Sequence, residues 1–540
     1  MRVRRRPSLF AGLLWAGLGT LFLVHNFGAG PDFWSFLGRY WPILLILLGL
    51  GKVIDYYRRK EGVALSVGEI VLILVLIAIG SAITKISETR FADLVGGIRL
   101  GDTPVGQWIG TSYTYNKEAS YPVTAPTPVR IENSYGLVSI SPGSDGEVRV
   151  RLKTVVYEND ASRAQEIANQ VVLQGVPQGQ AEANALVIKT NRDDLSAKDY
   201  RFNTDLEILV PKKAQVQVRN SFGELRAANL EGKLDLGTTH NTLDVRECTG
   251  DFTLSNRYAE SRLVGLTGNV TLDTRGRVYL ETIKGDVNVR NEYSPVTITD
   301  VDGKVTVSDT ESSISLEKIT KPVVVEARGT RVTASNLSDS IKIITSHQPV
   351  QVSDVAANLD LNSQYSRVTL KNIHGNVDVD SNSDQIGLDN IGGYLKIKAR
   401  ASRVRANSVD GPVDIQTTLR EVIVDSFNSA CNIINERANV TLTAGKLAKG
   451  DITVKDRNGD IELSLPQDAA FQVEANAREG RVETDCPGLM QTGGLKSSTS
   501  SDLTNFKGKV KTGGPLIILE NEYGNIRIRA RGSENPRVSQ

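Results

Sequence analysis

The chain has 540 residues, of which 40% are hydrophobic and 23% are charged. Its 63 Lys and Arg residues nearly balance its 62 Asp and Glu residues, so the formal net charge is +1. Because nucleic-acid binding requires an excess of positive charge, this balance argues against a nucleic-acid partner. The three cysteines are odd in number and too few to indicate a disulfide framework or a redox compartment.

Three apolar segments at the start of the chain predict transmembrane helices over residues 9–27, 34–54 and about 65–86. Each is long enough to cross a hydrocarbon layer of about 30 Å as a helix, the third only just. A cleaved signal peptide is the alternative for the first segment, because arginines precede it. No small-x-small cleavage site follows that segment, so residues 1–86 are predicted to form a three-helix membrane region.

Basic residues beside the predicted helices indicate their orientation. Arginines precede the first helix, and Arg58, Arg59 and Lys60 lie between the second and the third, whereas residues 28–33 contain no basic residue. The positive-inside rule then places the amino terminus and the second loop in the cytoplasm. We therefore expect a multi-pass protein of the bacterial cytoplasmic membrane, with the lipid bilayer as a partner and the chain from about residue 87 outside the cytoplasm.

A connector and a starter segment follow the membrane region. Residues 87–128 end in a proline-rich stretch and are predicted to be a semi-rigid spacer. Residues 129–222 are predicted to be a small α+β capping segment, with alternating strands over 129–156 and one helix that begins at an Asp160 cap. The helix has an apolar stripe, and we expect it to cover strand edges at the open end of the following domain. The stripe consists of Ala164, Ile167, Ala168 and Val171.

An 18-residue repeat runs from Gly232 to about Gly450 and is the most informative feature of the sequence. Its marker is a Gly or small residue followed by an alternating apolar strand. The marker recurs every 18 residues, except that Gly268 and Gly285 are 17 apart. A short fixed period over a dozen units is typical of stacked supersecondary repeats and not of a globular enzyme core.

The apolar positions within the repeat indicate its inward face. Counted from the marker, positions +2, +4, +11, +13 and +16 are apolar in nearly every unit, and positions +1, +3, +5 and +12 are polar. Each unit therefore predicts two short strands with one dry side. We expect a mainly β fold, with a β-solenoid of about twelve coils over residues 223–458 and a C-terminal β segment over 459–540. At about 4.8 Å per coil, the solenoid would be roughly 60 Å long.

Two of the cysteines occupy inward positions of this repeat. Cys248 is at +16 of its unit and Cys431 is at +2, so both are predicted to be small core residues. About ten coils, or roughly 50 Å, separate them, which excludes a disulfide between them. Cys486 lies in the irregular C-terminal segment.

Two parts of the chain resemble known families. The segment Gly38-Arg-Tyr-Trp-Pro-Ile-Leu-Leu-Ile-Leu-Leu-Gly-Leu, with the hydrophobic hairpin before it, resembles the LiaF-type transmembrane region of bacterial envelope-stress proteins. From Val129 onward, Val210-Pro-Lys, Val218-Arg-Asn-Ser-Phe-Gly-Glu-Leu and the Gly-Asp-Val-x-Val ladder resemble the bacterial "putative adhesin" β-solenoid family. The second resemblance implies an envelope location and adhesion, and it supplies no catalytic residues.

An acidic cluster is the best candidate for chemistry. Asp360 and Asp378 occupy +3 in consecutive coils and are expected to stack about 5 Å apart, with Asp380 two residues along the strand. Such a cluster could bind Ca²⁺ or place paired carboxylates for acid–base work on a sugar. The alternative is a solvated strand face on which Lys396 relieves the repulsion. We favour the alternative, because no His or Arg converges on the cluster.

A column of aromatic residues is the candidate binding surface. Position +8, in a turn, holds His240, Tyr258, Tyr293, His347 and Tyr365, with gaps at other residues in between. Rings along one edge would suit stacking against sugar rings or against a partner protein. The alternative is that turn positions simply tolerate amphipathic rings.

The sequence contains no zinc spacing, nucleophile elbow, phosphate loop or dinucleotide fingerprint, so we predict no enzyme activity, no cofactor and no resident metal. The expected function is that of a membrane-anchored envelope protein which acts as an adhesin, a scaffold or a ligand-binding module. Envelope polysaccharide or another envelope protein is the expected partner. One alternative is an envelope-stress sensor that acts with a membrane kinase, and a less favoured one is a polysaccharide-active enzyme.

Overall fold

The computed structural model describes residues 99–100, 103–104 and 111–531, apart from gaps at 124–126, 179–184, 196–197, 199, 383–384, 446–448 and 493–503. Two compact units divide the chain, one of residues 1–113, 156–167 and 195–202 and one of residues 114–155, 168–194 and 203–540. The three predicted transmembrane helices and their orientation lie outside the described residues. Within the described ranges, no helix is long and apolar enough to cross a membrane.

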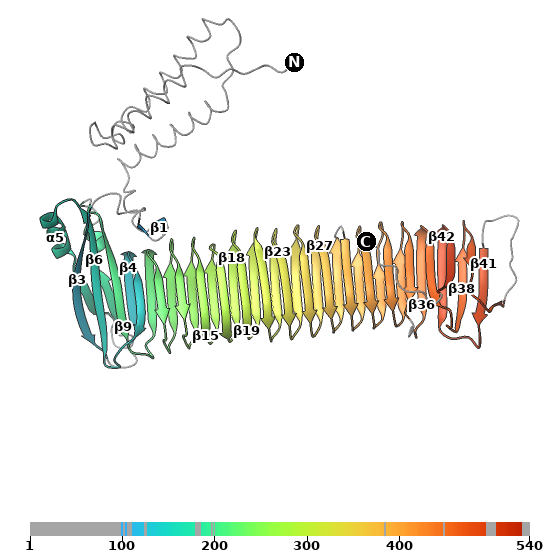
Figure 1. The fold of residues 1–540 in the computed structure, drawn as a ribbon, viewed down its shortest axis with the longest axis horizontal. Helices are drawn as coiled ribbons and strands as arrows, with labels where there is room; N and C mark the ends of the chain where they lie inside the picture. Colours follow the sequence, from blue (N-terminus) through green and yellow to red (C-terminus); the bar gives the residue numbers. More distant parts are fainter. Residues whose placement is uncertain are drawn as a thin grey trace, which may run out of the picture. The chain divides into compact units, whose positions relative to one another are not determined.

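The second unit is a two-sheet β-solenoid in which each coil contributes one strand to each sheet (Figure 1). We call the two the even sheet and the odd sheet, after the numbering of their strands. Each even strand from β10 to β34 pairs in parallel with the next even strand, so that the series ends at β36, and each odd strand from β11 to β35 does the same, so that the series ends at β37. These strands make fourteen coils, two more than predicted, because β10–β11 precede the first marker and β36–β37 follow the last.

The strands of these coils are short and uniform. The even strands are β10 (Val216–Phe222), β12 (Leu234–Thr238), β14 (Phe252–Asn256), β16 (Val270–Thr274), β18 (Val287–Glu292), β20 (Val305–Thr310), β22 (Val323–Arg328), β24 (Ile341–Ser346), β26 (Leu359–Gln364), β28 (Val377–Asn382), β30 (Leu395–Ala399), β32 (Val413–Gln416), β34 (Cys431–Asn435) and β36 (Ile452–Asn458). The odd strands are β11 (Leu225–Ala228), β13 (Leu243–Arg246), β15 (Ser261–Thr267), β17 (Val278–Lys284), β19 (Val296–Asp302), β21 (Ser313–Ile319), β23 (Arg331–Leu337), β25 (Val350–Val355), β27 (Arg367–Ile373), β29 (Gln385–Ile391), β31 (Arg403–Val409), β33 (Val422–Phe427), β35 (Val440–Ala444) and β37 (Ile461–Pro466).

The predicted inward positions form the core between the two sheets. In the Gly285 coil, the side chains at +2, +4, +11, +13 and +16 are at most 1% exposed. Burial of one Val, Leu or Ile stabilises the fold by about 1.5–3 kcal/mol, and stacking repeats this gain in every coil. Cys248 and Cys431 are free and 1% exposed, as predicted, and Cys486 is free and partly buried.

A left-handed residue at +15 explains why the inward positions jump from +13 to +16. In most coils this residue has a positive φ, as in Asp300 (59°), Asn372 (53°) and Asn390 (60°). The strand register skips it, since Glu281 pairs with Thr299 and Ile283 with Val301, while Thr282 has no register partner. One bulged residue moves the alternation by one position, so that +16 faces inward again. Asn and Asp are common here because they tolerate this conformation better than other residues that have a side chain.

Close backbone stacking explains the glycine markers. A Cβ atom at Gly285 would lie 2.4 Å from the carbonyl oxygen of Gly268 in the preceding coil, and Gly285 has a φ of 143°. Both conditions favour glycine, because any side chain would separate the turns of adjacent coils.

A buried polar column at +6 lies at the edge of the core and was not predicted. Its asparagines hydrogen-bond turn carbonyls, as Asn256 Nδ2 does to Ala259 O at 3.0 Å. Asp309 belongs to the column and accepts hydrogen bonds from Asn291 Nδ2, Ser312 Oγ and Thr330 Oγ1, each at 2.8 Å. Buried polar groups must be hydrogen-bonded to avoid a desolvation penalty, so the column fixes the turns of successive coils.

The predicted starter segment supplies a coil of its own. Strand β4 pairs in parallel with β10, and β5 pairs with β11. Additional strands extend both sheets, with β8 beside β4, β7 antiparallel to β8, β9 beside β5, and β3 beside β6. Their bounds are β3 (Thr111–Pro122), β4 (Val129–Tyr135), β5 (Val138–Pro142), β6 (Glu147–Glu158), β7 (Leu173–Gln178), β8 (Ala185–Thr190) and β9 (Phe202–Val210), and two short strands precede them, β1 (Arg99–Leu100) and β2 (Thr103–Pro104).

The spacer prediction for residues 87–128 is wrong for residues 111–122. Residues 111–122 form the long strand β3, with alternate residues partly buried. The prolines that suggested a spacer stand at Pro122, Pro126 and Pro128, at the end of the strand and beyond it. Proline is compatible with such positions because it needs no partner for its nitrogen there.

The predicted helix is present as α5 (Ala161–Gln170), and a single turn, α6 (Arg192–Leu195), follows later. Asp160 caps α5, because its Oδ1 accepts a hydrogen bond from Ser162 N at 2.7 Å. The four residues of the predicted apolar stripe are at most 1% exposed. Capping of the solenoid end by this helix stays a prediction.

The last coil of the chain is inserted between two earlier ones. After β37 the chain forms β38 and β39, then β40 and β41, and it returns as β42 and β43. Strand β42 lies between β36 and β38 and is parallel to both, while β43 pairs with β37 and β39 (Figure 1). Strand β41 runs antiparallel along the other edge of β38. The bounds are β38 (Phe471–Ala477), β39 (Val482–Thr484), β40 (Leu489–Gln491), β41 (Thr504–Val510), β42 (Leu516–Tyr523) and β43 (Ile526–Arg531).

Candidate functional site

The aromatic column at +8 forms two groups of stacked rings. His240 and Tyr258 lie 5.1 Å apart between ring centroids, and His347 and Tyr365 lie 5.4 Å apart. Tyr293 stands between these groups, and no ring contact joins it to either among the described residues. The sequence prediction therefore placed the residues on one edge correctly, but the structure brings only neighbours in consecutive coils together.

The first ring group continues into coils that the prediction did not include. Phe222 stacks on His240 at 4.4 Å with an interplanar angle of 13°, and Tyr135 stacks on Phe222 at 4.8 Å with an angle of 11°. The guanidinium of Arg192 lies 4.1 Å from the centroid of the Tyr135 ring, which is a cation–π distance. Phe222 stands 18 residues before His240, so the repeat could have revealed it.

The backbone of the +8 turn directs these side chains into solvent. Tyr293, His347 and Tyr365 have φ angles of 65°, 69° and 55°. Their N–H groups each donate to the carbonyl at +7 of the next coil, at 2.8–2.9 Å, which holds the turns in register. Tyr258, Tyr293 and Tyr365 are 56%, 62% and 63% exposed.

The acidic cluster is arranged as a solvated face. Asp360 and Asp378 are register partners on β26 and β28, and Asp380 follows on β28. Lys342 Nζ lies 3.6 Å from Asp360, and Lys396 Nζ lies 3.7 Å from Asp378. Among the residues that the structure describes, no group of three acidic, His or Cys side chains is placed to hold a metal ion, and a Ca²⁺ site at these aspartates stays a prediction.

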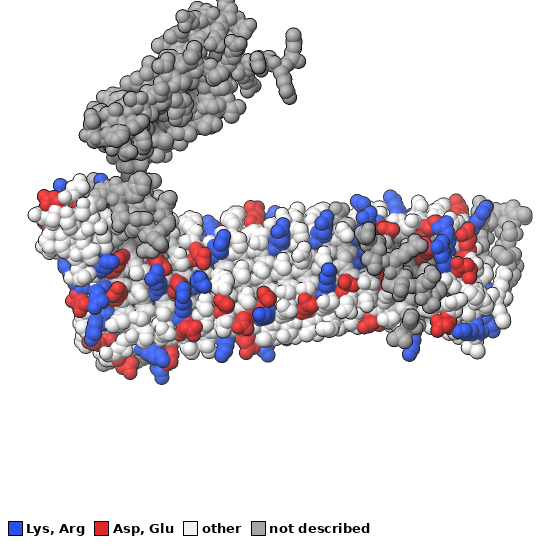
Figure 2. Space-filling model, viewed as in Figure 1, with Lys and Arg blue, Asp and Glu red and all other residues white. Residues whose placement is uncertain are grey.

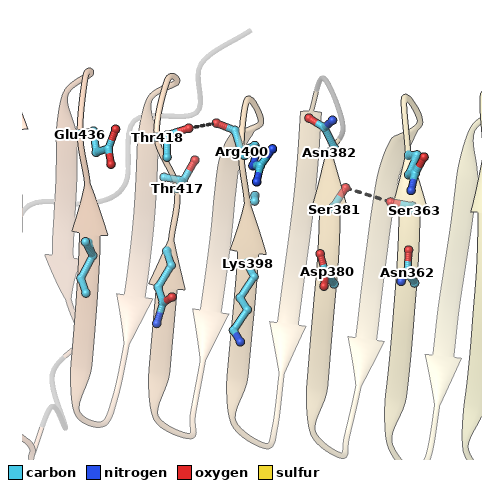
Figure 3. Close-up of a pocket in the computed structure, with 14 residues that line it drawn as sticks. Asn362, Ser363, Asp380, Ser381, Asn382, Lys398, Arg400, Thr417, Thr418 and Glu436 are labelled. Atoms are coloured by element: carbon cyan, nitrogen blue, oxygen red, sulfur yellow. Dashed lines mark hydrogen bonds between the residues drawn. The ribbon is translucent and has the colours of Figure 1, made fainter.

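A shallow groove lies on the outer face of the even sheet, over strands β24 to β34. Two hollows of about 630 and 550 Å³ share Asn362, Asp380 and Lys398 and so join into one depression. The lining is mostly polar, and Figure 3 shows side chains of consecutive strands side by side along one of the hollows. We call it the axial groove, and the acidic cluster forms part of its wall. Sequence reasoning found the aspartates but not the groove.

Charges of both signs are interspersed on one face of the solenoid. Figure 2 shows Lys and Arg interspersed with Asp and Glu on the face in view, without a large area of one sign. Such a surface has no strong long-range attraction for a polyanion. The distribution agrees with the net charge of +1.

The thiols have the properties of core residues. Burial raises the pKa of Cys431 to about 12, and burial also raises the pKa of the Cys248 thiol. Because the thiolate is the reactive form, neither residue can serve as a nucleophile in the folded protein.

Comparison with known proteins identifies the first part of the chain. Residues 10–95 match the LiaF transmembrane domain, which confirms the predicted resemblance and extends it. The match to a transmembrane domain indicates that the protein is located at a membrane. A search of curated proteins finds no match.

A solved structure is also similar to this chain, "a putative cell adhesion protein" from Clostridium sporogenes. It has 10% sequence identity, the match covers 77% of this chain and 100% of that one, and the TM-score is 0.11. A likeness at this TM-score carries no argument about function. The β-solenoid fold is nevertheless the one that the predicted family resemblance implied.

Proposed function

We propose that this protein is a membrane-tethered, noncatalytic binding protein of the bacterial cell envelope, with the β-solenoid as its binding domain. The LiaF transmembrane match at residues 10–95 supports the tether. The continuous stack of Tyr135, Phe222, His240 and Tyr258 is the observation that carries the binding role. The rings of Tyr135 and Phe222 are half-buried and those of His240 and Tyr258 are exposed, so the stack presents ring edges at a fixed spacing, which suits an extended ligand with repeated units. Adhesion, scaffolding and ligand capture are all uses of such a surface.

The proposed topology has three transmembrane helices, with the amino terminus in the cytoplasm and the solenoid outside it. The distribution of basic residues around residues 1–86 supports this arrangement. Single cysteines introduced at residues 61 and 110 of a Cys486→Ser variant, and labelled in whole cells with a membrane-impermeant maleimide, would test it, because the partly buried natural thiol at 486 would otherwise be labelled itself. We expect labelling at 110 and none at 61, and the reverse pattern would overturn the topology.

The test of the binding role uses the full-length protein in detergent. Binding to purified cell-wall material and to solubilised envelope proteins would be compared for the natural chain and for the triple variant Tyr258→Ala, Tyr293→Ala, Tyr365→Ala. We expect the variant to lose most of the binding. Tyr279→Ala is the matched control, because Tyr279 lies on the outer face of the odd sheet and hydrogen-bonds Glu281 at 2.7 Å. Absence of binding by the natural chain to any envelope component would refute the proposal.

A second candidate function is regulation of an envelope-stress response, with the solenoid as sensor. The match of residues 10–95 to the LiaF transmembrane domain is the observation that favours it. Affinity capture from solubilised membranes would distinguish the two roles. A histidine kinase recovered only when residues 1–98 are present would support the regulatory role, whereas recovery of cell-wall material that depends on the tyrosines would support the binding role.

A further inference from the structure

The axial groove crosses six consecutive coils of the even sheet. Its floor is the column at +5, which has an exposed isoleucine at each end and polar residues in between. Ile344 and Ile434 at the two ends are 42% and 41% exposed. Side chains in this column belong to register partners on adjacent parallel strands, so they repeat at about 4.8 Å along the solenoid. The complete column is Ile344, Asn362, Asp380, Lys398, Gln416 and Ile434.

The charges that line the groove balance one another. Lys342 pairs with Asp360 and Lys396 pairs with Asp378, so half of the charged lining is already neutralised within the protein. The other charged groups are Asp380, Lys398, Arg400 and Glu436, two of each sign. A polyanion or a polycation would meet as much repulsion as attraction here, which favours an uncharged ligand.

The backbone of these coils leaves no place for an added peptide strand. Each strand from β24 to β34 is hydrogen-bonded to the coil before it and to the coil after it. Recognition of an extended peptide by strand addition requires a free sheet edge. The groove must therefore recognise its ligand through side chains alone.

The side chains of the groove suit sugars. Carboxylate, amide, ammonium and guanidinium groups at fixed spacing can exchange hydrogen bonds with hydroxyl groups, which both donate and accept. Tyr394 lies in the wall and is 42% exposed, and with Ile344 and Ile434 it offers apolar contact for the faces of sugar rings. The His347–Tyr365 ring pair borders the groove, because Tyr365 directly follows the lining residue Gln364.

We propose that the axial groove binds a linear, uncharged polysaccharide that lies along the solenoid axis, with about one sugar ring for each coil. This inference rests on the proposed binding function and names its ligand class and its site. Asp380 and Lys398, register partners at the centre of the floor, are the principal hydrogen-bonding groups.

The test is calorimetric titration of the full-length protein in detergent with length series of chito-, cello- and malto-oligosaccharides, and with oligogalacturonate as the anionic comparison. We expect at least one uncharged series to bind, with an affinity that increases up to about six sugars, one for each coil, and then levels off. The double variant Asp380→Ala, Lys398→Ala should weaken this binding by about tenfold or more.

Asp273→Ala with Arg290→Ala is the matched control. These residues are exposed register partners in the same +5 column of the same face, outside the groove. We expect the control variant to bind as the natural chain does, and equal losses in both variants would overturn the inference.

The remaining outcomes separate this inference from the proposed function. Tighter binding of oligogalacturonate, or binding that survives the groove variant and is lost in the tyrosine variant, would overturn the groove as the site and leave the binding role intact. Binding of an envelope protein without binding of any oligosaccharide would also overturn the groove as the site and leave the binding role intact. Failure to bind oligosaccharides, cell-wall material and envelope proteins would overturn both this inference and the proposed binding function.

Discussion

Asp456 and Asn521 are register partners on the parallel strands β36 and β42, although the chain passes through a complete further coil between them. Asn521 Nδ2 donates to Gly459 O at 2.6 Å, and so joins the inserted coil to the turn beneath it. Asp456 is 5% exposed, and its Oδ2 has no hydrogen-bond partner. A buried, partly satisfied carboxyl therefore lies at the contact on which insertion of the last coil depends.

We predict that Asp456→Asn stabilises the C-terminal end of the solenoid at neutral pH. Burial raises the pKa of Asp456 to about 6, above its ordinary value of 3.8, because the charged form is desolvated. Removal of that charge should raise the local free energy of unfolding by about 2–3 kcal/mol. Hydrogen exchange of the amides in β36 and β42 would measure the gain.

Asp309→Asn is the control for this substitution. Asp309 occupies the same buried column, but its carboxylate accepts three side-chain hydrogen bonds. Burial raises the pKa of Asp309 as well, but the three hydrogen bonds act against this rise, so we expect a smaller stabilisation than at Asp456. Equal gains in both variants would contradict the role of the unsatisfied oxygen.

The stabilisation by Asp456→Asn should depend on pH. Because the folded pKa of about 6 exceeds the unfolded value near 3.8, the native state binds more protons than the unfolded state between these values. The stability of the natural chain relative to the variant therefore falls as pH rises from about 4 to about 6 and is constant above that. Thermal unfolding of both proteins at several pH values would measure the difference, and a gain that persists unchanged at pH 4 would contradict it.

The sequence predicted the solenoid because its apolar positions recur with one period. The burial of residues such as Val287 and Val296 follows from the alternation of side chains along a strand. The 18-residue period indicates in addition that the strands stack. The insertion of β42 could not be predicted in this way, because a repeat pattern indicates that a coil stacks but not which coil it contacts. The next even strand in sequence, β38, also has the apolar alternation to follow β36.

The candidate site was predicted only where the repeat was regular. Tyr258 and Tyr365 were found because they keep the period, whereas Tyr135 joins the ring stack across a helix and several strands that interrupt it. Tyr523 is 42% exposed and a register partner of Asn458, and it was missed because the last coil is out of sequence order. The groove was missed because its depth depends on the side chains of six coils together.

We predict that Gly285→Ala destabilises the middle of the solenoid by about 2–4 kcal/mol. Its Cβ would lie 2.4 Å from Gly268 O, and φ is 143°. Gly387→Ala is the control, because the nearest atom to its Cβ would be Val368 O at 3.8 Å. We expect the control to be neutral or slightly stabilising. Hydrogen exchange of β16 and β18 would locate the loss, and equal stability of the two variants would contradict the backbone-stacking explanation of the markers.

Thiol labelling should report opening at the two ends of the solenoid separately. Cys248 lies near the first coils and Cys431 near the last, and both are 1% exposed, so we expect a maleimide to leave them unmodified in the folded protein at neutral pH. Cys486 is only partly buried and should react first.

In a repeat protein the ends open before the middle, so mild denaturant should expose Cys431 without exposing Cys248 if the inserted coil is the weaker end. Asp456→Asn should then slow the labelling of Cys431 and leave Cys248 unchanged. Simultaneous labelling of both thiols would show instead that the solenoid unfolds as one cooperative unit.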